Sequence, residues 1–165
     1  MQAIEISDVR AFMQLLFQTN ILDRYEFVSG DLKTDLSYSI DGHINRDFYN
    51  TEELEIPPLT GHIFLPWVIA KDKIFQLIKG KKTPSQLKII LKAGPELLDT
   101  LLSETKSSLN PKDIDGIFLN ILYQDKTLNV ICGISYNIFT LDKELEHDFV
   151  NNIITLFKSN GISIE

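Results

Sequence analysis

Cysteine is almost absent from this chain, and so are the sequence signals of secretion and membrane insertion. The only cysteine, Cys132, cannot form an internal disulfide, which is compatible with a reducing cytoplasm. No stretch approaches the roughly 18 consecutive apolar residues that a membrane-spanning helix needs. The start, Met1–Glu5, lacks the basic residues and the apolar run of a signal peptide. We therefore expect a cytoplasmic protein with no membrane partner.

Positive charge is scarce as well. The 16 Lys and Arg residues are outnumbered by 23 Asp and Glu residues, which gives a formal net charge of -7 at pH 7. This balance argues against a general affinity for nucleic acid or for anionic membranes, although it is compatible with a local basic patch. We therefore do not expect the isolated chain to bind nucleic acid.

The sequence also lacks the common catalytic and metal-binding motifs. The run 133–137 has no closing glycine of a nucleophile elbow, and Cys132 falls in an apolar strand where no cation is evident to activate it. His43, His62 and His147 have no second His or Cys at ligand spacing. We therefore predict no catalytic residue, no metal site and no cofactor, while a site assembled from distant residues would leave no such motif.

What the chain does contain is an ordinary globular composition and a weak internal repeat. With 44% hydrophobic and 24% charged residues over 165 positions, it fits one compact domain, or two small halves sharing one core. Residues 25–54 align without a gap on residues 116–145, with roughly six identities in about thirty positions against about two by chance. The identical pairs are Phe27/Phe118, Ile40/Ile131, Gly42/Gly133, Phe48/Phe139, Glu53/Glu144 and Leu54/Leu145.

Hydrophobic periodicity and turn residues predict an α+β fold of two strand–helix–strand–strand units, about 1–54 and 86–145, joined by a connector at 55–85. Mainly antiparallel sheet with helices on one face is the expected architecture. Ser7 is a predicted helix N-cap. The predicted strands are 3–6, 25–33, 36–44, 86–92, 117–123 and 127–138, and the predicted helices are 8–19, one after Trp67, one from Gly94-Pro95 and one at 143–160.

The order of these elements resembles one domain of the DNA sliding-clamp fold. The runs that carry the resemblance are Ile4–Asp41 and Leu87–Gly133, through topology and hydrophobic pattern alone. The resemblance implies two units related by pseudo-twofold symmetry. Encirclement of DNA would require cationic helices, whereas segment 8–19 contains only Arg10 and segment 95–105 contains no cation.

A second resemblance covers nearly the whole chain. The runs 40–43, 77–84 and 139–143 are similar to a family of uncharacterised proteins from Firmicutes. Because the function of that family is unknown, the resemblance implies no catalytic residues for this chain.

The cluster Lys79, Lys81, Lys82 and Thr83, around Gly80, is the main candidate for a ligand site. Ammonium groups and loop N–H groups bind phosphate, and the run is similar to the end of a phosphate-binding loop. It lacks the Ser or Thr directly after Gly-Lys and the second glycine that such a loop requires. A solvated turn that keeps a strand edge soluble is the favoured interpretation, and anion binding is the alternative.

Trp67 is the second candidate, because an exposed tryptophan is a frequent anchor for a partner. Burial against the core is the favoured interpretation. The first functional hypothesis is a non-enzymatic protein-interaction or assembly module with a clamp-like scaffold, whose partner is another protein or a second copy of the chain. The alternative is an enzyme or small-anion-binding protein with a site near the connector and the Lys79–Thr83 loop.

Overall fold

The computed structural model describes residues 2–165 and contains one seven-stranded antiparallel sheet and five α-helices. The expected α+β architecture, with its C-terminal helix, is confirmed. In chain order the elements are β1 (Gln2–Ile6), α1 (Val9–Gln18), β2 (Tyr25–Lys33), β3 (Ser37–Asp41), α2 (Thr51–Glu55), β4 (Leu65–Pro66), α3 (Trp67–Ile78), β5 (Gln86–Ala93), α4 (Pro95–Glu104), β6 (Ile114–Gln124), β7 (Thr127–Tyr136) and α5 (Glu144–Ser159), with short 3-10 turns at Arg46–Phe48 and Pro111–Asp113.

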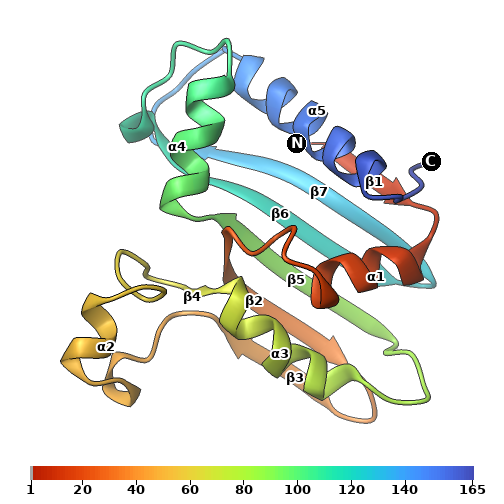
Figure 1. The fold of residues 1–165 in the computed structure, drawn as a ribbon. Coiled ribbons are helices and arrows are strands. Elements are labelled where there is room, and N and C mark those ends of the chain that lie inside the picture. Colours follow the sequence, from red (N-terminus) through yellow and green to blue (C-terminus); the bar gives the residue numbers. More distant parts are fainter. Residues whose placement is uncertain (1) are drawn as a thin grey trace.

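The strand order is β1-β7-β6-β5-β2-β3, and the short strand β4 pairs with β2 beside β3. Helices α1, α3, α4 and α5 cover one face of this sheet (Figure 1). Alternate residues of a central strand point toward this helical layer, and in β6 these residues, Ile117, Leu119 and Ile121, are fully buried. The hydrophobic core therefore lies between the sheet and its helices.

Local sequence explains where the first helix begins. The Asp8 side chain accepts a hydrogen bond from the Ala11 N–H at 3.0 Å, so Asp8 is the N-cap and the prediction of Ser7 is wrong by one residue. Along the helix, Phe12, Leu16 and their apolar neighbours are buried. This amphipathic pattern fixes which face of α1 packs on the core.

The two halves have the same order of elements but different strand pairings. Both β1-α1-β2-β3 and β5-α4-β6-β7 run strand, helix, strand, strand. Because β1 pairs with β7, a twofold axis that exchanged the halves would pair β5 with β3. Instead, β5 pairs with β2 and β6. The strand pairing therefore does not follow the pseudo-twofold symmetry that the sliding-clamp resemblance implies.

The two hairpins also differ by one residue in their turns. Three residues separate the paired residues Lys33 and Ser37, whereas two separate Gln124 and Thr127. A gapless alignment of the hairpins therefore shifts one strand of the pair out of register by one residue.

Gly42 shows this shift directly. Gly133 lies inside β7 opposite Phe118, whereas Gly42 lies just past the end of β3 and donates its N–H to the Val28 carbonyl at 2.9 Å. A Cβ atom at Gly42 would lie only 1.9 Å from the Phe27 carbonyl oxygen. Only glycine allows the chain to approach β2 this closely.

The two edges of the sheet are protected differently. Residues 162–165 run back along β1, where the Ser7 N–H donates to the Ser163 carbonyl and the Glu165 N–H donates to the Glu5 carbonyl, both at 3.0 Å. The C-terminus lies beside β1 in Figure 1. At the other edge, no strand pairs with the outer side of β3 within residues 2–165. One edge is therefore covered by the chain itself and the other is open.

Candidate functional site

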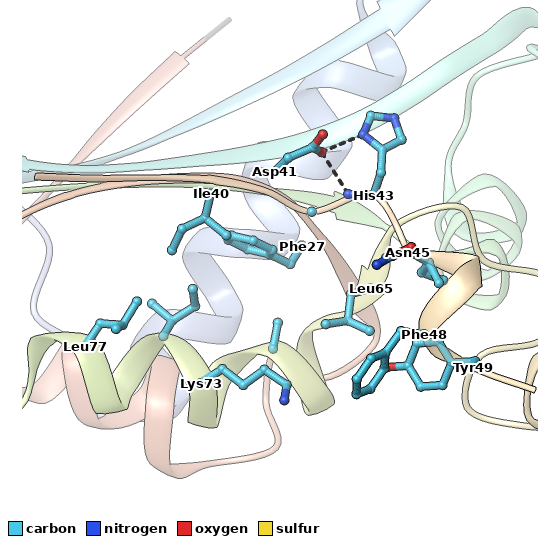
Figure 2. Close-up of a pocket in the computed structure, with 14 residues that line it drawn as sticks. Phe27, Ile40, Asp41, His43, Asn45, Phe48, Tyr49, Leu65, Lys73 and Leu77 are labelled. Carbon is cyan, nitrogen blue, oxygen red and sulfur yellow. Dashed lines mark hydrogen bonds and ion pairs between the residues drawn. The ribbon is translucent and has the colours of Figure 1, made fainter.

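A cavity of about 430 Å³ lies between the open edge at β3 and helix α3. Figure 2 shows Phe27 and Ile40 directed toward α3, with Leu77 and Lys73 on the helix below them. Leu65 and the turn of the 3-10 segment close one end. The lining is mostly apolar, as expected of a surface that takes up hydrophobic side chains.

The backbone of β3 presents free hydrogen-bonding groups beside this cavity. Since Gly42 bonds to Val28 of β2, alternate residues of the strand also direct their backbone groups to β2. The residues between them, Ser37, Ser39 and Asp41, direct theirs outward. The strand contains neither Lys nor Pro, two residues that commonly prevent an edge from pairing with another chain.

The mouth of the cavity carries an unusually exposed aromatic residue. Phe48 is 78% exposed and packs edge-on against Tyr49, with ring centroids 5.3 Å apart. Both residues line the cavity. Their position is fixed by local caps, because the Asn45 side chain accepts from the Asp47 N–H and begins the 3-10 turn. An exposed ring at a cavity mouth is available to a bound partner.

Asp41 and His43 form a polar pair on the other side of the strand. The His43 Nδ1 lies 2.6 Å from the Asp41 Oδ1, and the His43 N–H donates to the same oxygen at 2.9 Å. These hydrogen bonds, chiefly the one from the backbone N–H, lower the pKa of the Asp41 carboxyl. Both residues border the cavity, and Figure 2 shows their side chains on the opposite side of the strand from Lys73, which lies on α3.

The structure places the lysine cluster on a second cavity of about 480 Å³, between α1 and the segment that follows α3. Lys79, Lys81, Lys82 and Thr83 all line it. Arg10 of α1, which sequence reasoning did not connect with this cluster, lines it too. No local signal could have joined residues so far apart in the chain.

Trp67 is fully buried at the start of α3. Its Nε1–H donates to the Leu16 carbonyl at 3.0 Å, and its ring lies 5.7 Å from Phe17 and 6.0 Å from Phe27 between centroids. The indole therefore ties α3 to α1 and to the sheet, and it offers no surface to a partner.

A buried carboxylate was also missed by sequence reasoning. Glu26 is 5% exposed, accepts from the Phe64 N–H at 3.3 Å, and lies 3.4 Å from the His62 Nδ1. That nitrogen makes no hydrogen bond, so its contact with Glu26 is one of proximity without directed bonding. Within residues 2–165, no three His, Cys, Asp or Glu side chains are grouped so that they could hold a metal ion. In the same range, no helix is long and apolar enough to cross a membrane.

Comparison with protein families assigns the chain to a group. A family model described as a family of unknown function, DUF5721, matches residues 14–165. The chain belongs to this family. The match agrees with the resemblance to an uncharacterised family and adds no activity to it. No curated protein and no solved structure matches the chain.

Proposed function

We propose that this protein is an interaction module that binds an extended segment of a partner protein by adding a strand along β3. The observation that carries the proposal is the open edge of β3 directly beside an apolar cavity, while the opposite edge is covered by residues 162–165. Main-chain hydrogen bonds to an exposed sheet edge give affinity, and pockets for alternate side chains give specificity.

The cavity indicates what the partner segment contains. In an added strand, alternate side chains would lie on the same face as Ile40, which is the face that meets α3. Apolar side chains at alternate positions would therefore fill the cavity. Lys73 favours a carboxylate next to them, so the proposed segment alternates apolar residues and includes one Asp or Glu.

The proposal includes a non-enzymatic role in the cytoplasm, with another protein as the partner. A second copy of the chain is the competing occupant, because two open edges can also pair with each other. Occupancy of the edge by a second copy would depend on the concentration of this protein itself, whereas occupancy by a partner segment would depend on the concentration of the partner.

The test is a selection of displayed random nonapeptides on the immobilised full chain, followed by affinity measurement. Ser39→Pro removes one outward N–H without removing a bond to β2, and Phe48→Ser removes the exposed ring. We expect the selected peptides to alternate apolar residues and to bind each variant at least about tenfold more weakly than the natural chain. Phe139→Ser is the matched control, since Phe139 is 89% exposed and lies outside the cavity lining.

Three outcomes would overturn the proposal. Selection could yield no binding peptide, or the peptides could bind the Ser39→Pro variant as tightly as the natural chain. Sedimentation could also show a dimer that Ser39→Pro dissociates, which would assign the edge to a second copy. Circular dichroism of both variants establishes that they are folded.

A further inference from the structure

The groove beside the lysine loop combines positive charge with an apolar floor. Of the 16 Lys and Arg residues in the chain, four line this groove, namely Arg10, Lys79, Lys81 and Lys82. None of the 23 Asp and Glu residues lines it. In a protein with a net charge of -7, such a surface is locally opposite in sign to the rest of the molecule.

The floor of the groove comes from three separate parts of the fold. Helix α1 contributes Val9, Met13 and Phe17, which are spaced by four and therefore share one face. Helix α3 contributes Phe75 and Ile78, and β5 contributes a buried leucine. The volume of about 480 Å³ falls in the range of about 300–1,000 Å³ that small-molecule sites occupy.

The charges on the rim are not paired with carboxylates of the described residues. Within residues 2–165, no carboxylate lies within ion-pair distance of Arg10 or of the three lysines. By contrast, Lys71, in the first half of α3, forms a 2.7 Å ion pair with Asp23. A solvated turn accounts for the three lysines. It accounts neither for Arg10, which lies on α1, nor for the apolar floor that the four cations surround.

We propose that this groove binds a small amphipathic anion, an alkyl chain that carries a phosphate or carboxylate group. The alkyl chain would lie on the apolar floor, and the anionic group would lie among Arg10, Lys79, Lys81 and Lys82. The site lies at the C-terminal end of α3, away from the β3 edge, and does not depend on the proposed interaction function.

The test is calorimetric titration of the full chain with dodecyl phosphate below its micelle concentration. We expect saturable binding of one molecule per chain. Replacement of Lys79, Lys81 and Lys82 by Gln, which removes each charge and keeps part of each aliphatic stem, is expected to weaken binding about tenfold. The matched control replaces Lys106, Lys112 and Lys158 by Gln, three exposed lysines outside the groove, and should leave affinity unchanged.

Further ligands test the anionic group and the alkyl chain separately. Inorganic phosphate and the uncharged dodecyl maltoside should each bind far more weakly than dodecyl phosphate, because each supplies only one of the two interactions. Shortening the chain to octyl phosphate should weaken binding by up to about fourfold for each methylene that leaves the floor. Met13→Gln on the floor should weaken dodecyl phosphate binding and leave the melting temperature nearly unchanged.

Several results would overturn the proposal. These are the absence of saturable binding, equal affinity for dodecyl maltoside, or equal affinity of the two triple variants for dodecyl phosphate. Vesicles of phosphatidylglycerol distinguish a free ligand from a lipid headgroup. If the chain bound such vesicles but not dodecyl phosphate in solution, the basic rim would be a membrane-surface contact and the groove would not be a ligand site.

Discussion

At the scale of single residues, Cys132 shows how burial determines chemistry. Its side chain is fully buried in β7, and this desolvation raises the pKa of the thiol to about 12. The thiolate is the reactive form, so the native thiol should be inert at neutral pH. We expect its reaction with a disulfide reagent at pH 7.5 to be slow in the folded chain and fast in urea.

The comparison of those two rates is the control, because the same thiol is measured in both states. Rapid labelling of the folded chain would contradict the buried placement. The raised pKa also has a consequence for stability, since it stabilises the fold fully below the ordinary thiol pKa of about 8.5. Part of the free energy of unfolding should therefore be lost as the pH rises above that value.

Glu5 and Glu165 form a second titrating feature, at the covered edge of the sheet. Repulsion from Glu165, together with a hydrogen bond between the two side chains, raises the pKa of Glu5. A raised carboxyl pKa stabilises the folded arrangement below the unfolded value of about 4.3 and loses that effect as the pH rises through the folded value. The contact between residues 162–165 and β1 should therefore be weaker at neutral pH than at pH 4.

The Glu165→Gln variant tests this interpretation. Removal of one charge should slow hydrogen exchange of the residue 165 amide at pH 7, with little change at pH 4. Glu55→Gln, at the end of the exposed helix α2, is the control and should change neither rate. Equal exchange in the variant and the natural chain at pH 7 would show that the repulsion does not affect the covered edge.

At the scale of elements, the turn between β6 and β7 places two non-glycine residues in the left-handed backbone region. Asp125 and Lys126 both have positive φ, 52° and 61°, as a two-residue type I′ turn requires. Glycine adopts this conformation without the clash of a Cβ atom. We expect Lys126→Gly to raise the free energy of unfolding by about 0.5–1 kcal/mol in urea titration. Lys112→Gly, where φ is not positive, should give no gain, and destabilisation by Lys126→Gly would contradict the turn assignment.

Elements with strong local signals could be predicted from the sequence. The apolar residues of α5 recur every four positions, and the predicted helix at 143–160 is found at Glu144–Ser159. Pro95, at the start of α4, is a second local signal, because proline is favoured at the first position of a helix. Strand pairing could not be predicted, because the partners of β5 depend on contacts between distant segments and one residue more or less in a turn changes the register.

The candidate sites could be predicted only in part, for the same reason. Lys79, Lys81 and Lys82 are adjacent in sequence, so their clustering is visible without coordinates. Arg10 joins them only because α1 and α3 lie side by side. The β3 cavity gave no signal at all, since α3 and β3 meet only after the connector has returned along β2.

At the scale of the whole molecule, the distribution of charge argues against general electrostatic binding of polyanions. The net charge of -7 repels polyanions. The four cations of the groove beside the lysine loop, Arg10, Lys79, Lys81 and Lys82, occupy a single concave surface. A long duplex would need an extended cationic face to reach several phosphates at once. Helix α4 offers none, because it contains Glu96, Asp99 and Glu104 and no cation.

We therefore expect the isolated chain not to bind duplex DNA tightly at physiological salt. Fluorescence anisotropy with a labelled duplex of about 30 base pairs in about 0.15 M salt is expected to give no dissociation constant below about 1 µM, the strong end of non-specific binding. The triple Gln variant of Lys79, Lys81 and Lys82 serves as the control, since it should not differ from the natural chain in this assay. Submicromolar binding that weakens steeply as salt rises would contradict the prediction. Loss of that binding in the triple Gln variant would assign it to the groove cations.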